Sequence, residues 1–400
     1  MSVGGKSGPA AASIQLAPPG DGEVDVLFIA GEHSGDQHAA AIAHDLARRH
    51  PEWRLVAIGG PALRTARVQI LHDLTRDSVV GLVEVLRNYS FFKQLFGEIL
   101  RWIREHRPRI VVLVDYPGFN LRLAEALWRA GISRKGGGKV AVYQYISPQI
   151  WAWKAGRRFK MAKILDELGV IFPFEVACYG DTALPVCFVG HPFASPEYRN
   201  PVRYDPDGPV LLLPGSRNEA VRRIFPVMVR AIRKLFDEGV HHRCVCLYPG
   251  EEIRSILEEV LGREHLPPGM ITLRSVETGT TASSVLTSSG TMSLNCALAG
   301  IPGAVVYRAH PLTTWIGKRL VKIEWLGIAN LVLNRPLYPE YLQEAARPGA
   351  LAGRIGEILA HPEAQKSFAE GARELRERLG ATEVVSVAER LEELVKGPSQ

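Results

Sequence analysis

Hydroxyl, glycine and amide residues occur together where a helix is predicted to begin. Ser289, Gly290 and Thr291 follow a short β-rich run at 285–287 and precede residues at helical spacing. A helix that begins there presents free backbone N–H groups and the positive end of its dipole, which suit a phosphate or diphosphate. Asn295 lies one turn deeper, roughly 6 Å along the axis, where a nucleotide's ribose would lie. The alternative is an ordinary capped βαβ turn.

A carboxylate follows another predicted strand, the apolar run at 109–114 (RIVVLV). Asp115 comes directly after this run and beside a Pro-Gly turn. Open α/β sheets bind ligands outside the carboxyl ends of their strands. Asp115 is therefore the best-placed general base in the chain. It could instead cap the next helix.

Three more loops follow predicted strands. The first strand, 24–30 (VDVLFIA), is a continuous apolar run typical of a buried parallel strand and leads into GEHSGD at 31–36, which could also be a simple turn with an N-cap. The strand at 140–146 precedes SPQIWAWK, whose tryptophans and lysine could line an acceptor pocket or belong to core and rim. Arg217 follows the strand at 210–213 and could offset a diphosphate's charge with its planar fork of donors.

These loops need a scaffold, and the alternation of predicted strands and helices indicates an α/β fold. Four hundred residues exceed one core, so we expect two domains of similar type. A Pro-rich stretch before residue 210 marks the boundary. We therefore expect a leader at 1–23, domains at 24–200 and 201–348, and C-terminal helices at 349–400 that could pack on a partner as a homodimer. The first domain would hold the acceptor and the second the nucleotide.

Composition excludes several classes of protein. No run of eighteen apolar residues exists, and the Gly-, Ala- and Pro-rich leader lacks the apolar core of a signal peptide. The GxGxxG fingerprint after the first strand is absent, which argues against a dehydrogenase. The five cysteines form no CxxC pair, so we expect buried free thiols in a reducing cytoplasm and no metal site. The net charge of +6 suits anionic substrates or an anionic membrane, and we expect no nucleic-acid partner.

The stretch 79–107 combines a wide aromatic face with basic flanks. Phe92, Leu95, Phe96, Ile99 and Ile103 share one helical face. Such a helix could rest on an anionic bilayer. It could equally cover a sheet, as most amphipathic helices do.

Taken together, the motifs resemble those of the bacterial lipid-A-disaccharide synthase family of inverting GT-B glycosyltransferases. Residues 31–36 (GEHSGD) are similar to the family's GEASGD, and residues 145–153 (YISPQIWAW) to its YVSPSVWAW. Residues 213–217 (LPGSR) and 289–291 (SGT) also match, as do 314–322 (TWIGKRLVK) and the run from 330 to 343. The likeness covers roughly residues 24–385 in the same order.

The resemblance implies a fold of two Rossmann-like domains whose parallel sheets face an interdomain cleft. It also implies transfer of 2,3-diacylglucosamine from UDP-2,3-diacylglucosamine to 2,3-diacylglucosamine 1-phosphate, forming a β-1,6 disaccharide 1-phosphate and UDP. No metal or cofactor is needed. The enzyme would work in the cytoplasm, peripheral to the cytoplasmic face of the inner membrane.

The resemblance also implies roles for individual residues. Asp115 would be the base. The acceptor would contact a set of residues in the first half: Glu32, Ser34, Asp36 and Trp151. The nucleotide would contact a set in the second half: Ser216, Arg217, Ser289, Gly290, Thr291, Asn295, Asn330 and Gln343.

Three positions depart from the family pattern. Asn295 stands where the family's SGTxxLE motif has Glu, Gly118 where DAPDFN has its second Asp, and His33 where a small Ala is usual. An amide binds ribose less strongly than a carboxylate, since hydrogen bonds to charged groups contribute about 1.5–3 kcal/mol against about 1 for neutral ones. We therefore predict weaker binding of the nucleotide or a changed nucleotide. Two alternatives remain: another GT-B enzyme acting on a different nucleotide-sugar or acylated acceptor, such as an epimerase, and a non-catalytic lipid- or nucleotide-binding paralogue.

Overall fold

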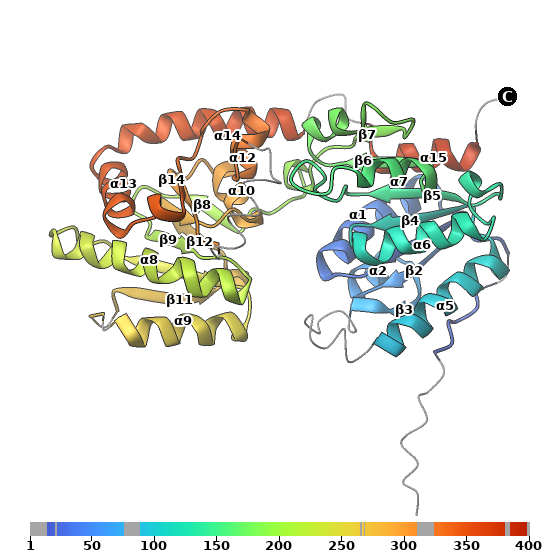
Figure 1. The fold of residues 1–400 in the computed structure, drawn as a ribbon, viewed down its shortest axis with the longest axis horizontal. Helices are drawn as coiled ribbons and strands as arrows, with labels where there is room; N and C mark the ends of the chain where they lie inside the picture. The colour runs from blue at the N-terminus through green and yellow to red at the C-terminus, as the bar shows by residue number, and fades with distance from the viewer. Residues whose placement is uncertain are drawn as a thin grey trace, which may run out of the picture. The chain divides into compact units, whose positions relative to one another are not determined.

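The computed structural model describes residues 14–20, 22–75, 89–264, 266–267, 269–309, 324–380 and 385–397. The chain divides into two compact units (Figure 1). Unit 1 comprises Met1–Ile171, Glu175–Val189 and Val384–Gln400, and unit 2 comprises Phe172–Phe174 and Gly190–Glu383. Each unit is built on a parallel sheet, as the alternating strand and helix patterns predict.

The sheet of unit 1 has the strand order β3-β2-β1-β4-β5-β6-β7, and every pair in it is parallel. Strands β1, β2, β4, β5 and β6 are buried along their whole length, which explains why they read as continuous apolar runs. The strands are β1 (Val26–Ala30), β2 (Leu55–Gly59), β3 (Gln69–Asp73), β4 (Ile110–Val114), β5 (Ala141–Tyr145), β6 (Glu167–Val170) and β7 (Val186–Phe188).

Helices cover both faces of this sheet. Alternate residues of each strand point to opposite sides, so each face presents apolar side chains that pack against helices. On one face, Leu27, Ile29, Val111 and Leu113 pack with α5, α6 and α7. On the other face, strand residues such as Phe28 pack with α1, α2 and α15. The helices are α1 (His33–Arg49), α2 (Pro61–Thr65), α5 (Tyr89–His106), α6 (Pro117–Arg129), α7 (Arg157–Ile164) and α15 (Val387–Lys396).

The sheet of unit 2 repeats this plan, with the order β11-β10-β9-β13-β14-β15. A separate two-stranded parallel sheet pairs β12 with β8. The strands are β8 (Val202–Tyr204), β9 (Val210–Leu213), β10 (Cys244–Tyr248), β11 (Ile271–Ser275), β12 (Thr280–Ala282), β13 (Ser284–Thr287), β14 (Gly303–Tyr307) and β15 (Glu340–Leu342).

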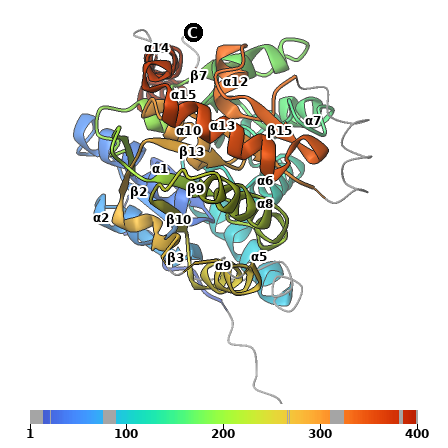
Figure 2. The same cartoon turned by 90° about the vertical axis from the view of Figure 1, so that its left-hand side faces the viewer.

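The helices of unit 2 form two groups. In the first, α8 lies beside α9 and α13 over a core that includes Leu212, Cys246 and Leu286 (Figure 2). In the second, α10, α12 and α14 contact one another. The helices are α8 (Asn218–Asp237), α9 (Glu251–Glu264), α10 (Thr291–Leu298), α12 (Ile328–Leu333), α13 (Pro348–Ala360) and α14 (Gln365–Leu379).

The division of the chain differs from the expected boundaries at 200 and 348. The main segment of unit 2 begins at Gly190, and the C-terminal helices are shared: α13 and α14 pack in unit 2, whereas α15 packs on α1, β4 and β5 of unit 1. Glu167 of β6 accepts two hydrogen bonds from Arg390 of α15, at 2.6 and 2.8 Å. Apolar residues of these helices thus pack within the chain, and the homodimer stays a prediction.

The stretch 79–107 is described only from residue 89. There it forms α5, whose Leu95, Ile99 and Ile103 are fully buried in the core of unit 1. The described part therefore covers a sheet, while residues 76–88 lie outside the described residues, as do 1–13 of the leader and the matching run at 314–322. In the described part of the chain, no helix is both long and apolar enough to cross a membrane.

Candidate active site

The strand order of each sheet reverses at one point. In unit 1 the reversal lies between β1 and β4, and in unit 2 between β9 and β13. The loops that leave such a pair of strands run in opposite directions and open a crevice at the carboxyl ends, where α/β folds bind ligands. Each unit therefore has one topologically favoured ligand site, and both are lined by the loops singled out in the sequence.

In unit 1 this site brings Glu32 and Asp115 together. Glu32 follows β1 and precedes α1, and its side chain is exposed. Asp115 follows β4 and is half-buried. Burial and, to a smaller extent, the negative charge of Glu32 raise the pKa of Asp115, and a hydrogen bond from the Tyr116 N–H lowers it, so that the pKa is about 6. A carboxylate with this pKa is suited to accept a proton near neutral pH.

The backbone at Asp115 is strained. Asp115 and Tyr116 both have φ of 46°, in the left-handed region that residues with a side chain rarely adopt. Two buried amides hold this turn: Asn120 donates to the carbonyl of Asp115 at 2.8 Å, and Gln144 donates to the same carbonyl at 3.2 Å. Strain of this kind persists only where the surroundings enforce it, and it is concentrated at functional sites.

Asn120, Gln144 and Tyr116 were not among the site residues expected from the sequence. Gln144 could have been identified from the sequence, because it is the one amide side chain in the strand AVYQY. The structure shows that it is fully buried. Buried amides need hydrogen-bond partners, and the partners of Gln144 are the carbonyls of Asp115, Tyr145 and Ile146.

The other residues expected on the acceptor side have different surroundings. Ser34 lies exposed in the first turn of α1. Asp36 is fully buried, and its two oxygens accept hydrogen bonds from the backbone N–H groups of Gly60 at 2.7 Å and Ala62 at 2.8 Å. The expectation that Asp36 contacts the acceptor is therefore corrected: its carboxylate satisfies the free N–H groups at the start of α2.

The loop after β5 carries the two tryptophans. Trp151 is half-buried, whereas Trp153 is 50% exposed. The loop leaves the strand that pairs with β4, and the Asp115 N–H donates to the carbonyl of Tyr145 at 2.9 Å. The loop that carries Trp153 thus begins at the same edge of the sheet as Asp115.

In unit 2 the two expected nucleotide loops lie side by side. The N–H of Ser288 donates to the carbonyl of Leu213 at 2.8 Å, which joins the loop after β13 to the loop after β9. Gly215 has φ of 115°, and a Cβ there would lie 3.1 Å from Ser288 Oγ, so the loops pack closely because glycine is present.

The groups available to a ligand at this edge come from both loops. Ser216 and Arg217 are exposed, Ser289 and Gly290 are partly exposed, and Thr291 begins α10 with an exposed side chain. The structure thus brings together the residues that the sequence predicted for a diphosphate. The free N–H groups and dipole of α10 add to the positive charge of Arg217.

Asn295 and Asn330 are turned inward. Asn295 is 2% exposed, and its Oδ1 accepts a hydrogen bond from the Tyr198 hydroxyl at 2.9 Å. Asn330 is fully buried and bonds the backbone of Tyr338 through both side-chain atoms, with Glu340 as a further acceptor. These contacts correct the expectation that the two amides hold the nucleotide, because their polar atoms already have partners inside unit 2.

Gln343 remains at the carboxyl edge of the sheet, directly after β15. Its φ is 51°, and its Oε1 accepts a hydrogen bond from the N–H of Ala309 at 3.3 Å. This bond ties the loop after β15 to the loop after β14. Gln343 thus follows a strand that lies two places from β13, whose loop is predicted to bind the diphosphate. Its side chain, however, already bonds to the backbone of Ala309.

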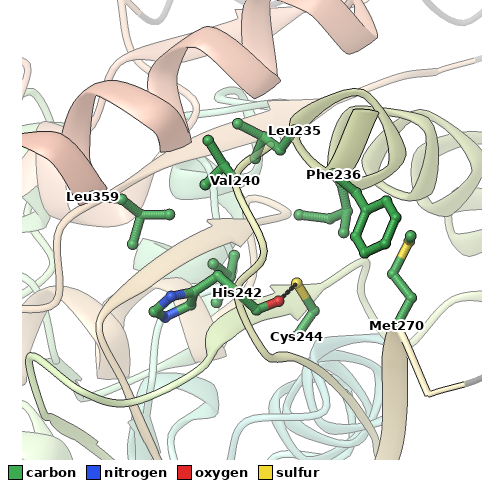
Figure 3. Close-up of a pocket in the computed structure, with 9 residues that line it drawn as sticks. Leu235, Phe236, Val240, His242, Cys244, Met270 and Leu359 are labelled. Atoms are coloured by element: carbon green, nitrogen blue, oxygen red, sulfur yellow. Dashed lines mark hydrogen bonds between the residues drawn. The ribbon is translucent and has the colours of Figure 1, made fainter. Parts of the chain in front are cut away.

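A small apolar pocket lies at the opposite edge of this sheet (Figure 3). It is lined by Val210 and Cys244, the first residues of β9 and β10, and by Leu235, Val240 and Leu359. With a volume of about 10 Å³ it has room for little more than one water molecule. Its position and size exclude it as the site for a nucleotide sugar.

The cysteines and the possible metal ligands of the described residues form no additional site. All five cysteines are free, and Cys244, Cys246 and Cys296 are buried while Cys178 and Cys187 are half-buried. Within the described ranges, no three His, Cys, Asp or Glu side chains gather so that they could hold a metal ion.

Comparison with known proteins identifies the family of the chain. A family model described as lipid-A-disaccharide synthetase matches residues 26–393. The chain is 34% identical over 374 residues to a lipid-A-disaccharide synthase of Geobacter metallireducens, which covers 89% of this chain and 93% of the relative. It is 35% identical over 373 residues to one of Trichlorobacter lovleyi, with the same coverage.

A solved structure supports the fold. The UDP-GlcNAc 2-epimerase of Neisseria meningitidis, bound to UDP-GlcNAc, superposes with a TM-score of 0.57 at 10% identity, covering 89% of this chain and 99% of that chain. At this identity the likeness concerns the arrangement of strands and helices alone.

Proposed function

The chain belongs to the lipid-A-disaccharide synthase family, and on this basis we propose that it transfers 2,3-diacylglucosamine from a UDP donor to 2,3-diacylglucosamine 1-phosphate. The products are the β-1,6-linked disaccharide 1-phosphate and UDP. The protein is a glycosyltransferase of the GT-B type, with two Rossmann-like units.

Asp115 is the general base of this reaction in our proposal. The 6-hydroxyl of the acceptor attacks C1 of the donor sugar, the C1–O bond to UDP breaks, and its electron pair leaves with UDP. The hydroxyl proton passes to the Asp115 carboxylate in the same displacement, which inverts the configuration at C1. The raised pKa supports this role, because a base works best when its pKa lies near the working pH.

Unit 2 stabilises the leaving diphosphate. Negative charge grows on UDP as the C1–O bond breaks, so fixed positive groups lower the barrier. Arg217 offers two or more N–H donors in one plane, and the start of α10 offers backbone N–H groups beside Gly290 and Thr291. Ser216 and Ser289 supply hydroxyl groups next to them, and Gln343 lies at the same edge of the sheet. Asn295 and Asn330 support these loops from inside the unit.

Glu32, Ser34 and Trp151 form the acceptor side. Glu32 and Ser34 present exposed polar groups beside Asp115, where they can bind sugar hydroxyls. Both substrates carry two acyl chains that need a lipid phase, so the enzyme works at the cytoplasmic face of the inner membrane. The net charge of +6 supports contact with anionic lipid there.

The single observation that carries the proposal is the placement of Asp115 beside Glu32 at the switch point of unit 1, on a backbone turn held by buried amides. Gly118, which stands where the family has a second Asp, is exposed, and a Cβ there would meet nothing within 4 Å. The base therefore does not depend on a side chain at position 118 for its support.

A transfer assay tests the proposal. Purified protein, radiolabelled UDP-2,3-diacylglucosamine and the acceptor are mixed in detergent micelles, with Asp115→Asn as the test variant. Asp237→Asn, an exposed carboxylate at the end of α8, is the control. We expect disaccharide from wild type and control and a loss of 10²–10⁴-fold in the variant. Equal rates for all three would remove Asp115 from catalysis, and UDP binding without any disaccharide would favour a binding paralogue.

A further inference from the structure

The loop after β5 carries an exposed indole that is followed in the sequence by two cations near its ring. Trp153 is 50% exposed, Lys154 Nζ lies 4.4 Å from its ring centroid, and Arg157 Cζ lies 5.6 Å from the same centroid. Cations are attracted to an indole face, and the attraction is strongest where water is excluded. We call Trp153, Lys154 and Arg157 the indole patch.

The cations of the indole patch differ from their neighbours in pairing. Arg158 makes a two-pronged ion pair with Asp181, with both N···O distances at 2.6 Å, and Lys160 is paired with Glu125. In the described part of the chain, no carboxylate lies within ion-pair distance of Lys154 or Arg157. The segment therefore neutralises two of its cations and leaves two positive charges at one exposed aromatic ring.

The loop is fixed by its own backbone. The N–H of Trp153 donates to the carbonyl of Gln149 at 3.3 Å, and the N–H of Arg157 donates to the carbonyl of Lys154 at 2.9 Å. Lys154 has φ of 54°, a left-handed conformation that costs free energy for a residue with a side chain. The three side chains are thus presented by a defined turn of the loop that begins at the same edge of the sheet as Asp115.

We propose that the indole patch binds the phosphate group of the acceptor, with Lys154 and Arg157 on the phosphate oxygens and Trp153 against the sugar ring. This inference rests on the proposed function, because it assigns the site of one group of that substrate. Two cations suit a phosphate monoester, whose charge at neutral pH is between −1.5 and −2. An indole face suits the C–H groups of a pyranose ring.

The placement explains how one of two similar sugars is selected. Donor and acceptor share the diacylglucosamine unit, and the free monoester phosphate distinguishes the acceptor. The phosphate at C1 and the hydroxyl at C6 lie at opposite ends of the ring. A phosphate held at the indole patch therefore leaves the 6-hydroxyl at the other end of the sugar, on the side available to Asp115.

The test compares acceptors with and without the phosphate. Short-acyl analogues that dissolve without detergent are used, both as the 1-phosphate and as the free sugar, with Lys154→Ala, Arg157→Ala and the double variant. Lys163→Ala on the same helix is the matched control, because Lys163 is exposed and no carboxylate in the described part lies within ion-pair distance of it. We expect each single variant to lose 10–100-fold in kcat/KM for the phosphorylated acceptor and less than threefold for the free sugar.

Trp153→Ala separates the two contacts. Loss of stacking should weaken both acceptors, whereas loss of a cation should weaken the phosphorylated one alone. If the cation variants lower the rates with both acceptors equally, or with neither, the phosphate assignment is overturned. The expected discrimination also appears in KM more than in kcat, because the phosphate does not change charge during the reaction.

Two further measurements distinguish this inference from the proposed function on which it rests and from binding of a lipid headgroup. Titration calorimetry with glucosamine 1-phosphate, inorganic phosphate and glucosamine measures binding without turnover. Phosphate-dependent binding that is lost in the double variant supports the site even if wild type makes no disaccharide, in which case the proposed reaction fails alone. Sedimentation with phosphatidylglycerol vesicles tests a lipid headgroup as the source of phosphate. Loss of vesicle binding in the double variant with unchanged acceptor discrimination would reassign the indole patch to the membrane.

Discussion

The ring of Tyr116 lies so close to Gly31 that a Cβ atom at Gly31 would be 2.5 Å from Cδ1 of Tyr116. Gly31 begins the loop after β1, and Tyr116 follows the proposed base in the left-handed turn after β4. The ring also stacks on Phe119 with the centroids 5.9 Å apart. The loops after β1 and β4, which form the switch point of unit 1, therefore pack closely because the ring of Tyr116 lies against a residue that has no side chain.

Gly31→Ala is expected to reduce activity more than stability. The added methyl group must displace the Tyr116 ring and with it the turn that carries Asp115, at a cost of about 1–3 kcal/mol for overpacking. We expect kcat to fall by at least tenfold while the thermal unfolding midpoint falls by a few degrees. Tyr116→Leu in the same chain should restore part of the rate by making room. A double variant no faster than Gly31→Ala would contradict this account.

The rate should depend on the ionisation of Asp115. Its pKa is about 6, and the base must be deprotonated, so kcat/KM is expected to be flat above pH 7 and to fall about tenfold per unit below pH 6. The acceptor phosphate titrates in the same range, so a second variant is needed. Glu32→Gln removes a negative charge that raises the pKa of Asp115, and the acid limb should move to lower pH. An unmoved limb would assign it to the phosphate.

Asp115→Asn is expected to stabilise the folded protein. The pKa of Asp115 in the folded protein lies above the ordinary value of 3.8 for an aspartate, so the stability linked to this group is fully present below pH 3.8 and is lost as the pH rises through about 6. At pH 8 the variant should therefore be more stable by roughly 1–3 kcal/mol. The difference should shrink towards pH 4. Urea unfolding at several pH values measures it, and a pH-independent difference would contradict burial as its cause.

Asp36 is expected to support the fold and not the acceptor. Its carboxylate accepts hydrogen bonds from the backbone N–H groups of Gly60, Ala62 and Leu63. Asp36→Asn replaces charged acceptors by a weaker amide and should lower the free energy of unfolding by about 1.5–3 kcal/mol. The KM for the acceptor should stay within twofold at a temperature where the variant is folded. A large change in KM with unchanged stability would restore the acceptor role.

Arg217 is expected to hold the diphosphate. Arg217→Ala should weaken UDP binding about 10–100-fold, since a hydrogen bond to a charged group contributes about 1.5–3 kcal/mol. Arg217→Lys should recover only part of the loss because a point charge lacks the planar fork. Titration calorimetry with UDP alone measures this without an acceptor. Arg203→Ala, which removes an exposed arginine from β8 of the same unit, serves as the reference and should bind like wild type.

The sequence predicted the central strands well because burial on both faces makes them continuous apolar runs. The expected strand at 210–213 matches β9 residue for residue, and the expected strands at 109–114 and 285–287 differ from β4 and β13 by one residue at the start. Two edge strands, β3 and β15, were not predicted. The residues of β3 and β15 are mostly partly exposed, and their mixed polarity gives no run to detect. The order of strands, and hence the switch points, comes from tertiary packing that periodicity does not encode.

The loops of the site were predictable, but the direction of each side chain was not. Asp115, Arg217 and Thr291 follow strands that end at one edge of a sheet, so their approximate place follows from position alone. Asp36 and Asn330 lie in equally suggestive segments, yet they face inward to bond backbone groups. A polar residue in a motif can either meet a ligand or hold the loop that does, and sequence spacing is the same in both cases.

The docking of α15 on the first sheet has a consequence for biosynthesis. Strands β1, β2 and β4 leave the ribosome early, but the helix that covers part of their second face is encoded in the last residues of the chain, and Arg390 reaches its partner Glu167 only then. Domains often fold in order from the N-terminus as they are made. Here part of one apolar face of the first sheet stays uncovered until residues 387–396 have been made, so it is exposed while the whole of unit 2 is synthesised.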